Sequence, residues 1–144
     1  MDYESGSSKG AQTVMNVVNS YAWGYDANDM DRLASIFDQD AIASGVVSGT
    51  SVGWGPWTGR KAIVEGLAAI RLEQTDRRRH QLTTPMFLTL TDQNAVVKVY
   101  LSLYSTPQGE KPRLVTTGHY IAELGKVAGT WKIRRLETEL DGAF

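Results

Sequence analysis

The amino-acid sequence predicts an α+β fold in which helices come first and an antiparallel sheet follows. Three observations support this prediction. Apolar side chains recur at helical spacing in three segments between residues 11 and 72. From residue 80 onward they alternate with a period of two, in four segments separated by turn residues. Helices followed by strands, rather than an alternation of the two, are typical of helices that cover one face of an antiparallel sheet.

The first two helices are predicted from apolar faces separated by a stop signal. The first helix begins at residue 11, and its spacing puts six side chains on one face: Val14, Val17, Val18, Tyr21, Ala22 and Tyr25. Asn28 and Asp29 then supply a helix end and the N-cap of the next helix. This short second helix repeats the apolar spacing at Met30, Leu33, Ala34 and Phe37.

The middle of the chain is predicted to hold a short strand, a loop and a third helix. Residues 42–47 are expected to form the strand, and the Gly-rich segment 48–57 is expected to be a loop that carries Trp54 and Trp57. The helix is expected over about residues 59–72, with four side chains in the core: Ala62, Ile63, Leu67 and Ile70.

Four strands make up the rest of the chain. The first begins at His80 and is predicted to place alternate residues on one face: Leu82, Thr84, Met86, Leu88 and Leu90. The turns 92–94 and 125–129 and the loop 107–112 separate it from strands at 95–103, 114–124 and 130–140. Such a sheet, covered by helices on one side, should curl into a cone whose mouth suits a small ligand.

The length of 144 residues fits one domain with a core of its own. Residues 1–10 are polar and rich in Ser and Gly, so we expect a flexible tail ahead of a single domain at 11–144. The tail lacks the apolar core of a signal peptide, and no apolar run approaches the length of a membrane span. We therefore expect a cytoplasmic protein without a membrane partner.

Composition and charge exclude several classes of function. The chain has no cysteine, which excludes disulfides, thiol nucleophiles, zinc fingers and iron–sulfur clusters. Its formal net charge of −1 gives no field that would recruit nucleic acid. The basic run at residues 77–79 lacks interleaved aromatic residues and is typical of a solvated helix end. No nucleic-acid partner is expected.

Several separated segments, in the right order, resemble the nuclear transport factor 2-like (SnoaL-like) superfamily. They lie at residues 21–26, 31–37, 40–41, 59–60, 118–120 and 129–133, and the resemblance covers residues 11–140. It implies a cone-shaped α+β fold, with three N-terminal helices and a curved antiparallel sheet that enclose a pocket. This fold serves dehydratases, isomerases, hydrolases, cyclases and non-catalytic binding modules, so the fold alone does not decide the function.

Within the superfamily the chain is most similar to scytalone dehydratase-like enzymes, and this likeness implies four catalytic residues. Those enzymes carry a Tyr-Asp pair at the end of the first helix, matched here by Tyr25 and Asp26, and a His at the start of the long strand, matched by His80. His119 is the counterpart of a second His on a following strand. A second catalytic tyrosine expected within 42–57 is missing, and residues 11–25 lack the lysine of the related dehydrochlorinase.

The residue types fit acid–base chemistry, although a structural role is the alternative for each. Histidine is the usual general base near neutral pH, and a hydrogen-bonded Asp fixes its tautomer. Asp26 could instead be a solvated helix-terminal carboxylate, which the helix dipole disfavours, and His80 could simply close the basic run. His119 could be a core histidine that shares a strand face with Val115, Thr117 and Ile121, and Tyr25 could be a core residue.

The sequence also bears on the roles of the two tryptophans and on whether the protein binds a metal. Trp54 and Trp57 are candidates for substrate binding at the pocket mouth, and a subunit interface is the alternative. Two histidines and a carboxylate also suit non-heme iron. However, the separations are long and no His-x-Asp or His-x-Glu pair occurs. Together with the metal-free chemistry that the resemblance implies, this leads us to expect no metal and no cofactor.

The sequence thus predicts a cofactor-independent lyase, a dehydratase that acts on a small hydrophobic hydroxy-carbonyl or polyketide-like compound. His80, oriented by Asp26, would remove the proton, His119 would assist the leaving hydroxyl, and Tyr25 would hold the carbonyl. The alternatives are an isomerase or cyclase of secondary metabolism with the same dyad, or a non-catalytic ligand-binding module. Apolar residues on both faces of residues 95–104 predict a homo-oligomer. The resemblance implies a trimer, with a dimer as the alternative.

Overall fold

The computed structural model describes residues 2–144, and the side chains of residues 8–144. Its three helices are α1 (Asp2–Asp26), α2 (Met30–Ile36) and α3 (Arg60–Leu72). The six strands are β1 (Phe37–Val47), β2 (Gly53–Thr58), β3 (Arg77–Leu90), β4 (Asn94–Thr106), β5 (Arg113–Val127) and β6 (Thr130–Leu140). The predicted α+β fold is confirmed, with helices in the first half and long strands in the second.

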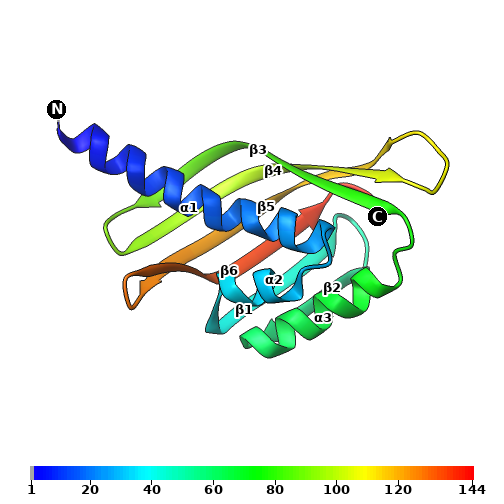
Figure 1. Ribbon diagram of the computed structural model, residues 1–144, viewed down its shortest axis with the longest axis horizontal. Helices are drawn as coiled ribbons and strands as arrows, with labels where there is room; N and C mark the ends of the chain where they lie inside the picture. The colour runs from blue at the N-terminus through cyan, green and yellow to red at the C-terminus, as the bar shows by residue number, and fades with distance from the viewer. Residues whose placement is uncertain (1) are drawn as a thin grey trace.

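All six strands belong to one sheet with the order β2-β1-β6-β5-β4-β3. The predicted meander of β3 to β6 is antiparallel throughout, whereas β1 pairs with β6 in parallel, from Phe37 opposite Ile133 to Val47 opposite Leu140. Because β1 lies between β2 and β6, the strand nearest the N-terminus is held beside the last one. Figure 1 shows α1 lying across the sheet, with α2 and α3 beside it over β1 and β2.

The first helix is longer than its apolar periodicity predicts. It begins at Asp2, so residues 2–10, which were expected as a tail, have helical backbone that is continuous with the rest of α1. A helix that is already nucleated extends at low cost, even through Ser and Gly of modest propensity. The apolar face itself is as predicted, since Val14, Val18 and Tyr21 are buried in the core.

The junction between α1 and α2 forms as the sequence predicts. Asn28 adopts a left-handed backbone conformation, with φ of 56°, directly after the end of α1. The Asp29 carboxylate then accepts a hydrogen bond from the backbone N–H of Arg32 at 3.0 Å, which caps α2. A Cβ added to Gly24 would lie 3.2 Å from Cγ of Leu33, so a glycine here lets α1 approach α2 closely.

The segment expected as a loop at 48–57 is partly a strand. Its second half forms β2, which pairs antiparallel with β1. Both tryptophans of β2 lie flat on a glycine: a Cβ on Gly45 would be 2.0 Å from Trp54, and one on Gly66 of α3 would be 2.4 Å from Trp57. The two glycines therefore leave the space that each indole ring occupies.

The predicted inner face of β3 is confirmed at Leu82 and Leu90 and is wrong at Thr84, Met86 and Leu88. Met86 and Leu88 are exposed, at 60% and 55%, whereas Leu82 and Phe87 pack against the core. The register against β4 shifts twice along this stretch, and Thr84, just before Pro85, has a φ of 55°. An irregularity of one residue reverses which side chains face the core.

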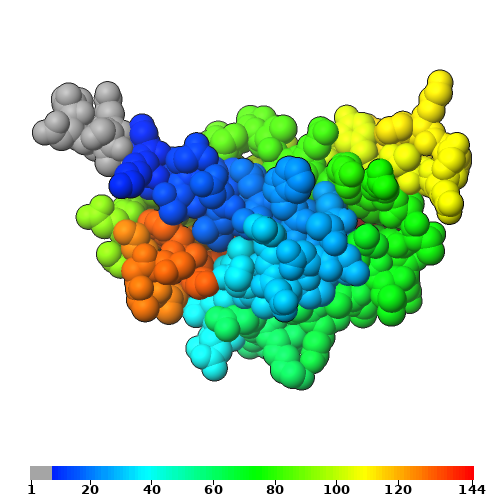
Figure 2. Space-filling view, in the orientation of Figure 1, coloured from blue at the N-terminus to red at the C-terminus, as the bar shows by residue number. Residues whose placement is uncertain are grey.

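The core lies between the helices and the sheet, and the strand alternation is regular in β4. Its predicted inward residues Val97, Val99, Leu101 and Leu103 are all buried. Figure 2 shows the helix-covered face, with the tip between β4 and β5 projecting at one end of the molecule. Among the helices described for residues 2–144, none is long and apolar enough to cross a membrane.

Candidate functional site

Asp26 and His80 form a buried pair that joins the end of α1 to the beginning of β3. One carboxylate oxygen of Asp26 lies 2.6 Å from Nδ1 of His80, and the other accepts the backbone N–H of His80 at 2.8 Å. Both side chains are about one-tenth exposed, at 10% for Asp26 and 9% for His80. Because two bonds from the same residue hold the carboxylate, the imidazole has one fixed orientation. The sequence-based prediction that these residues meet is confirmed.

The position of Asp26 is costly for the helix, which supports a role beyond helix stability. A carboxylate at a helix C-terminus is opposed by the helix dipole, by about 0.3–1 kcal/mol. The last turn of α1 contains no basic residue of its own. Arg71 from α3 supplies the missing charge, since its Nε donates to the carbonyl oxygen of Tyr25 at 3.2 Å. The end of α1 is thus stabilised from outside.

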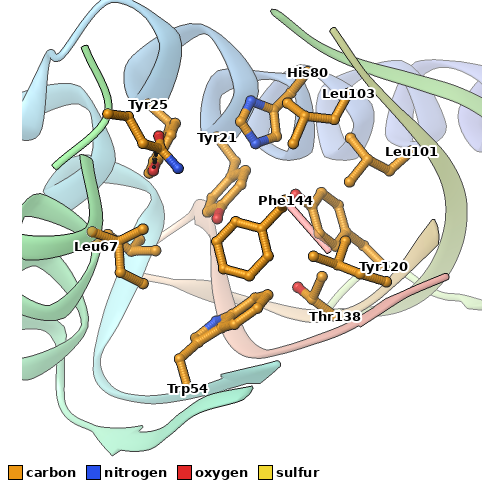
Figure 3. A pocket seen from close by; sticks show the side chains of 13 residues that line it. Tyr21, Tyr25, Trp54, Leu67, His80, Leu101, Leu103, Tyr120, Thr138 and Phe144 are labelled. Atoms are coloured by element: carbon orange, nitrogen blue, oxygen red, sulfur yellow. Dashed lines mark hydrogen bonds between the residues drawn. The ribbon is translucent and has the colours of Figure 1, made fainter. Parts of the chain in front are cut away.

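His80 lines a cavity between the helices and the sheet, and Asp26 holds the imidazole from behind. Figure 3 shows the His80 ring at the edge of the cavity, above Tyr21, with Trp54 at the opposite side and the Phe144 ring between them. The walls are mostly apolar, and the polar groups that reach the cavity come from six residues: Tyr21, Tyr25, Gln74, His80, Tyr120 and Thr138. Its free volume is about 30 Å³, enough for one or two water molecules.

The rings of Tyr21 and Tyr25 pack edge to face with the imidazole, Tyr120 lines the same cavity, and all three keep their phenol protons. The Tyr25 ring meets His80 edge to face at 5.0 Å, and its hydroxyl donates to Oε1 of Gln74 at 2.7 Å. Burial raises the pKa of Tyr25 to about 12, against the opposing charges of Arg78 and Arg71. These phenols can therefore act as neutral hydrogen-bond donors at physiological pH.

Tyr21 and Tyr120 are site residues that sequence reasoning did not single out. Their rings pack edge to face at 5.4 Å. Burial raises the pKa of Tyr21 well above its usual value, although a hydrogen bond with Tyr120 opposes this. Burial likewise raises the pKa of Tyr120. Tyr21 occurs in the predicted apolar stripe, one turn before Tyr25, and that spacing was the available signal for a second phenol beside the dyad.

The prediction that His119 faces the pocket is wrong. It lies on the outer face of β5, where its Cα pairs with Tyr100 of β4 and Glu139 of β6. Its side chain is 33% exposed, and its Nε2 is 3.9 Å from a carboxylate oxygen of Glu139. Successive residues of a strand point to opposite faces, and in β5 the inward position belongs to Tyr120.

The two tryptophans have different surroundings. Trp54 lines the cavity, and its ring meets that of Phe144 edge to face at 5.4 Å. Trp57 does not line this cavity and lies against Gly66 of α3 instead, so its predicted substrate contact is not supported. In the described part of the chain, no three His, Asp or Glu side chains come together as a candidate metal site.

One comparison with known proteins identifies a family, and another finds solved structures with a similar fold. The family model for the SnoaL-like domain matches residues 11–137. A search among curated proteins finds no match to this chain. Among solved structures, a protein of unknown function with a cystatin-like fold from Nostoc punctiforme PCC 73102 has a TM-score of 0.79 and 16% identity. That superposition covers 93% of this chain and 92% of the other.

Two further structures carry functional descriptions of their own. A candidate scytalone dehydratase from Novosphingobium aromaticivorans DSM 12444 has a TM-score of 0.73 and 20% identity, over 93% of this chain and 88% of its own. The β subunit of a proposed aromatic-ring-hydroxylating dioxygenase from the same organism has a TM-score of 0.78 and 11% identity, over 100% and 94%. At such identities the likeness shows the fold, and the family model covers most of the sequence. The chain therefore belongs to the SnoaL-like domain family.

Proposed function

We propose that this protein is a cofactor-independent lyase that dehydrates a small hydrophobic hydroxy-carbonyl compound. The observation that carries the proposal is the buried Asp26–His80 pair, whose imidazole lines an aromatic cavity. Members of the family include dehydratases and cyclases, and both chemistries begin by removing a proton from carbon next to a carbonyl. A histidine held by a carboxylate inside an apolar pocket suits that step.

The geometry favours one nitrogen of the imidazole as the base that takes the substrate's proton. Nδ1 is engaged with Asp26, so Nε2 is the nitrogen that is left to act as the base. When Nε2 takes the proton, the Asp26 carboxylate stabilises the imidazolium that forms. Negative charge develops at the same time on the carbonyl oxygen of the substrate. The neutral phenol of Tyr21 is a nearby donor for that oxygen. Tyr25 would donate to it only by exchanging its hydrogen bond to Gln74 for one to the substrate.

Loss of water then needs a proton for the leaving hydroxyl. Because His119 lies on the outer face of the sheet, the proton on Nε2 of His80 is the one that this mechanism uses. The carbon–oxygen bond breaks, the hydroxyl leaves as water with that proton, and the carbon–carbon double bond forms. His80 returns to its neutral state, so one residue serves as base and then as acid.

The same observation favours an isomerase or cyclase as the second candidate. A single base that takes a proton and returns it elsewhere is sufficient for either reaction. A non-catalytic module is the third candidate, and the small free volume of the cavity, about 30 Å³, is the feature that supports it.

Incubation with a panel of β-hydroxy aromatic ketones in D₂O tests these candidates. A dehydratase gives the conjugated enone, which its ultraviolet absorption reports. An isomerase or cyclase exchanges deuterium into the carbon next to the carbonyl without loss of water. Both signals should vanish in His80→Ala. If members of the panel bind but none is dehydrated or exchanged, the enzymatic proposal is wrong and the binding-module candidate gains.

A further inference from the structure

A second hollow lies beside the dyad cavity, at the ends of β3, β4 and β5. Its polar lining comes from Thr75, Asp76, Arg78, Ser105 and Arg113, and its free volume is about 490 Å³. Phe144 lines both this hollow and the dyad cavity. The Phe144 ring therefore lies between a small aromatic chamber and a larger, charged one.

Arg78 has a donor that no described residue satisfies. Its Nε donates to Asp76 at 2.7 Å, and Ser105 donates to the same carboxylate oxygen. Its Nη1 is buried and has no hydrogen-bond partner among the described residues. The side chain as a whole is only 11% exposed. A buried guanidinium nitrogen without a partner is costly, and a carboxylate is a ligand that a guanidinium group binds strongly.

The charge balance of the hollow also favours an anion. Burial opposes ionisation of Asp76, but the hydrogen bonds from Ser105 and Arg78 outweigh it and lower the pKa of this carboxyl. Asp76 is thus charged at neutral pH and offsets one arginine. Arg113, the second arginine of the hollow, has no ion pair with any described residue. One positive charge is left over.

The spacing along β3 connects this hollow to the base. Arg78 and His80 are two residues apart, and both pair with inward positions of β4, Ser105 and Leu103. Residues i and i+2 of a strand share a face and lie about 7 Å apart. If the substrate's carboxylate binds at Arg78, a substrate carbon about 7 Å from that carboxylate would lie next to His80.

Phe144 can move without breaking a buried polar contact. Its ring is 38% exposed and packs against Trp54. The chain before it is held separately, by two hydrogen bonds between Thr116 and the backbone of Gly142. If the ring swings outward, the cavity and the hollow join, and an apolar ring of the substrate can take its place.

We propose that Arg78 and Arg113 bind a carboxylate of the substrate, whose apolar ring replaces Phe144 against Trp54 and whose acidic carbon lies at His80. This inference rests on the proposed function only where it places the acidic carbon of the substrate at His80. The substrate class is narrowed to hydrophobic hydroxy-carbonyl compounds that also carry a carboxylate.

Binding of cinnamate and of its neutral amide, cinnamamide, measures the charge preference directly. Calorimetry on the wild-type protein should give at least about tenfold tighter binding of cinnamate. Arg113→Gln and Arg78→Gln should each remove most of that preference, and Phe144→Ala should strengthen the binding of both probes. Arg79→Gln is the matched control, because Arg79 is exposed on the opposite face of the same strand and should change nothing. Thermal melting verifies that each variant is folded. If Arg78→Gln does not fold, Arg78→Lys is tested in its place.

The outcomes separate this inference from the proposed function. In His80→Ala the preference for cinnamate should persist although turnover is lost. A charge preference without any turnover in the wild-type protein would contradict the lyase and leave the carboxylate site standing. Equal affinities for the two probes, an unchanged preference in Arg113→Gln, or no binding of cinnamate to Phe144→Ala up to about 10 mM would each overturn the carboxylate site.

Discussion

His80 and His119 are the two histidines of this chain, and the sheet separates them. His80 is buried, held by both oxygens of Asp26 and directed at an aromatic cavity. His119 is one-third exposed on the outer face, where its Nε2 lies 3.9 Å from a carboxylate oxygen of Glu139. The resemblance assigned both to the site, and only one is there. A family position fixes the strand on which a residue lies, whereas the face depends on alternation, where one step reverses the result.

The largest effect is expected at the buried histidine. His80→Ala and Asp26→Asn should each reduce turnover by about two to four orders of magnitude, the usual contribution of general acid–base catalysis. Because the residues act as one unit, the double variant should be hardly worse than the worse single variant. Steady-state kinetics on a substrate found in the ketone panel measure this. Multiplicative losses would show that the two residues work independently.

One step along β5 should separate a site residue from an outer one. Tyr120→Phe removes a hydroxyl beside Tyr21 and is expected to slow turnover by about tenfold, since it alters the hydrogen bonds offered to the substrate oxygen. His119→Gln, the adjacent variant and its control, should stay within about twofold of the wild-type rate. A large loss in His119→Gln would break the comparison and bring His119 back into the mechanism.

The phenols of Tyr21, Tyr25 and Tyr120 should ionise at higher pH than ordinary tyrosines. Burial raises the pKa of Tyr25 to about 12 and those of Tyr21 and Tyr120 beyond their usual value near 10. A raised pKa in the folded state means that the neutral phenol stabilises the fold fully below pH 10. That contribution is lost as the pH rises toward 12. Ultraviolet titration with circular dichroism should show three of the six tyrosines ionising late, together with unfolding. Ionisation of all six near pH 10 in a folded protein would contradict the burial of the site.

The smallest effect on catalysis is expected from the outer face where His119 lies. We propose that this face contacts further copies of the chain, because it exposes large apolar side chains. Tyr100, which pairs with His119, is 60% exposed, and Leu114 of β5 is 54% exposed. Tyr100→Asp should therefore reduce the sedimentation coefficient and leave turnover within about twofold. If the wild-type protein sediments as a monomer at micromolar concentration, the oligomer prediction fails.

Prediction from sequence succeeded where a local pattern is regular. The apolar stripe of α1, the cap at Asp29 and the alternation of β4 all follow from spacing alone. It failed at β3, because the register shifts around Thr84 and Pro85 reverse the face of Met86 and Leu88. The contact between Asp26 and His80 was predictable only through the family resemblance, since 54 residues separate them in sequence.

The remaining site residues show a different limit. The sequence does not single out Tyr120, because the adjacent His119 is the stronger chemical signal, although period-two alternation allows only one of the two to face inward. Phe144 reaches the cavity from the end of the described chain, after three residues without regular structure. No periodicity can predict such a position. Arg78 was hidden in a basic run whose two neighbours, Arg77 and Arg79, are exposed.

Gly45, the glycine beneath Trp54, affects the shape of the cavity although it is not one of the residues that line it. Gly45 contributes no atom to the cavity, yet a single methyl group there would occupy the place of the indole ring. The ring would have to move toward Phe144 or out of the wall, and the chamber would change size with every lining residue intact. Substrate range in this protein can therefore drift, or be redesigned, through a residue that no comparison of cavity-lining side chains would include.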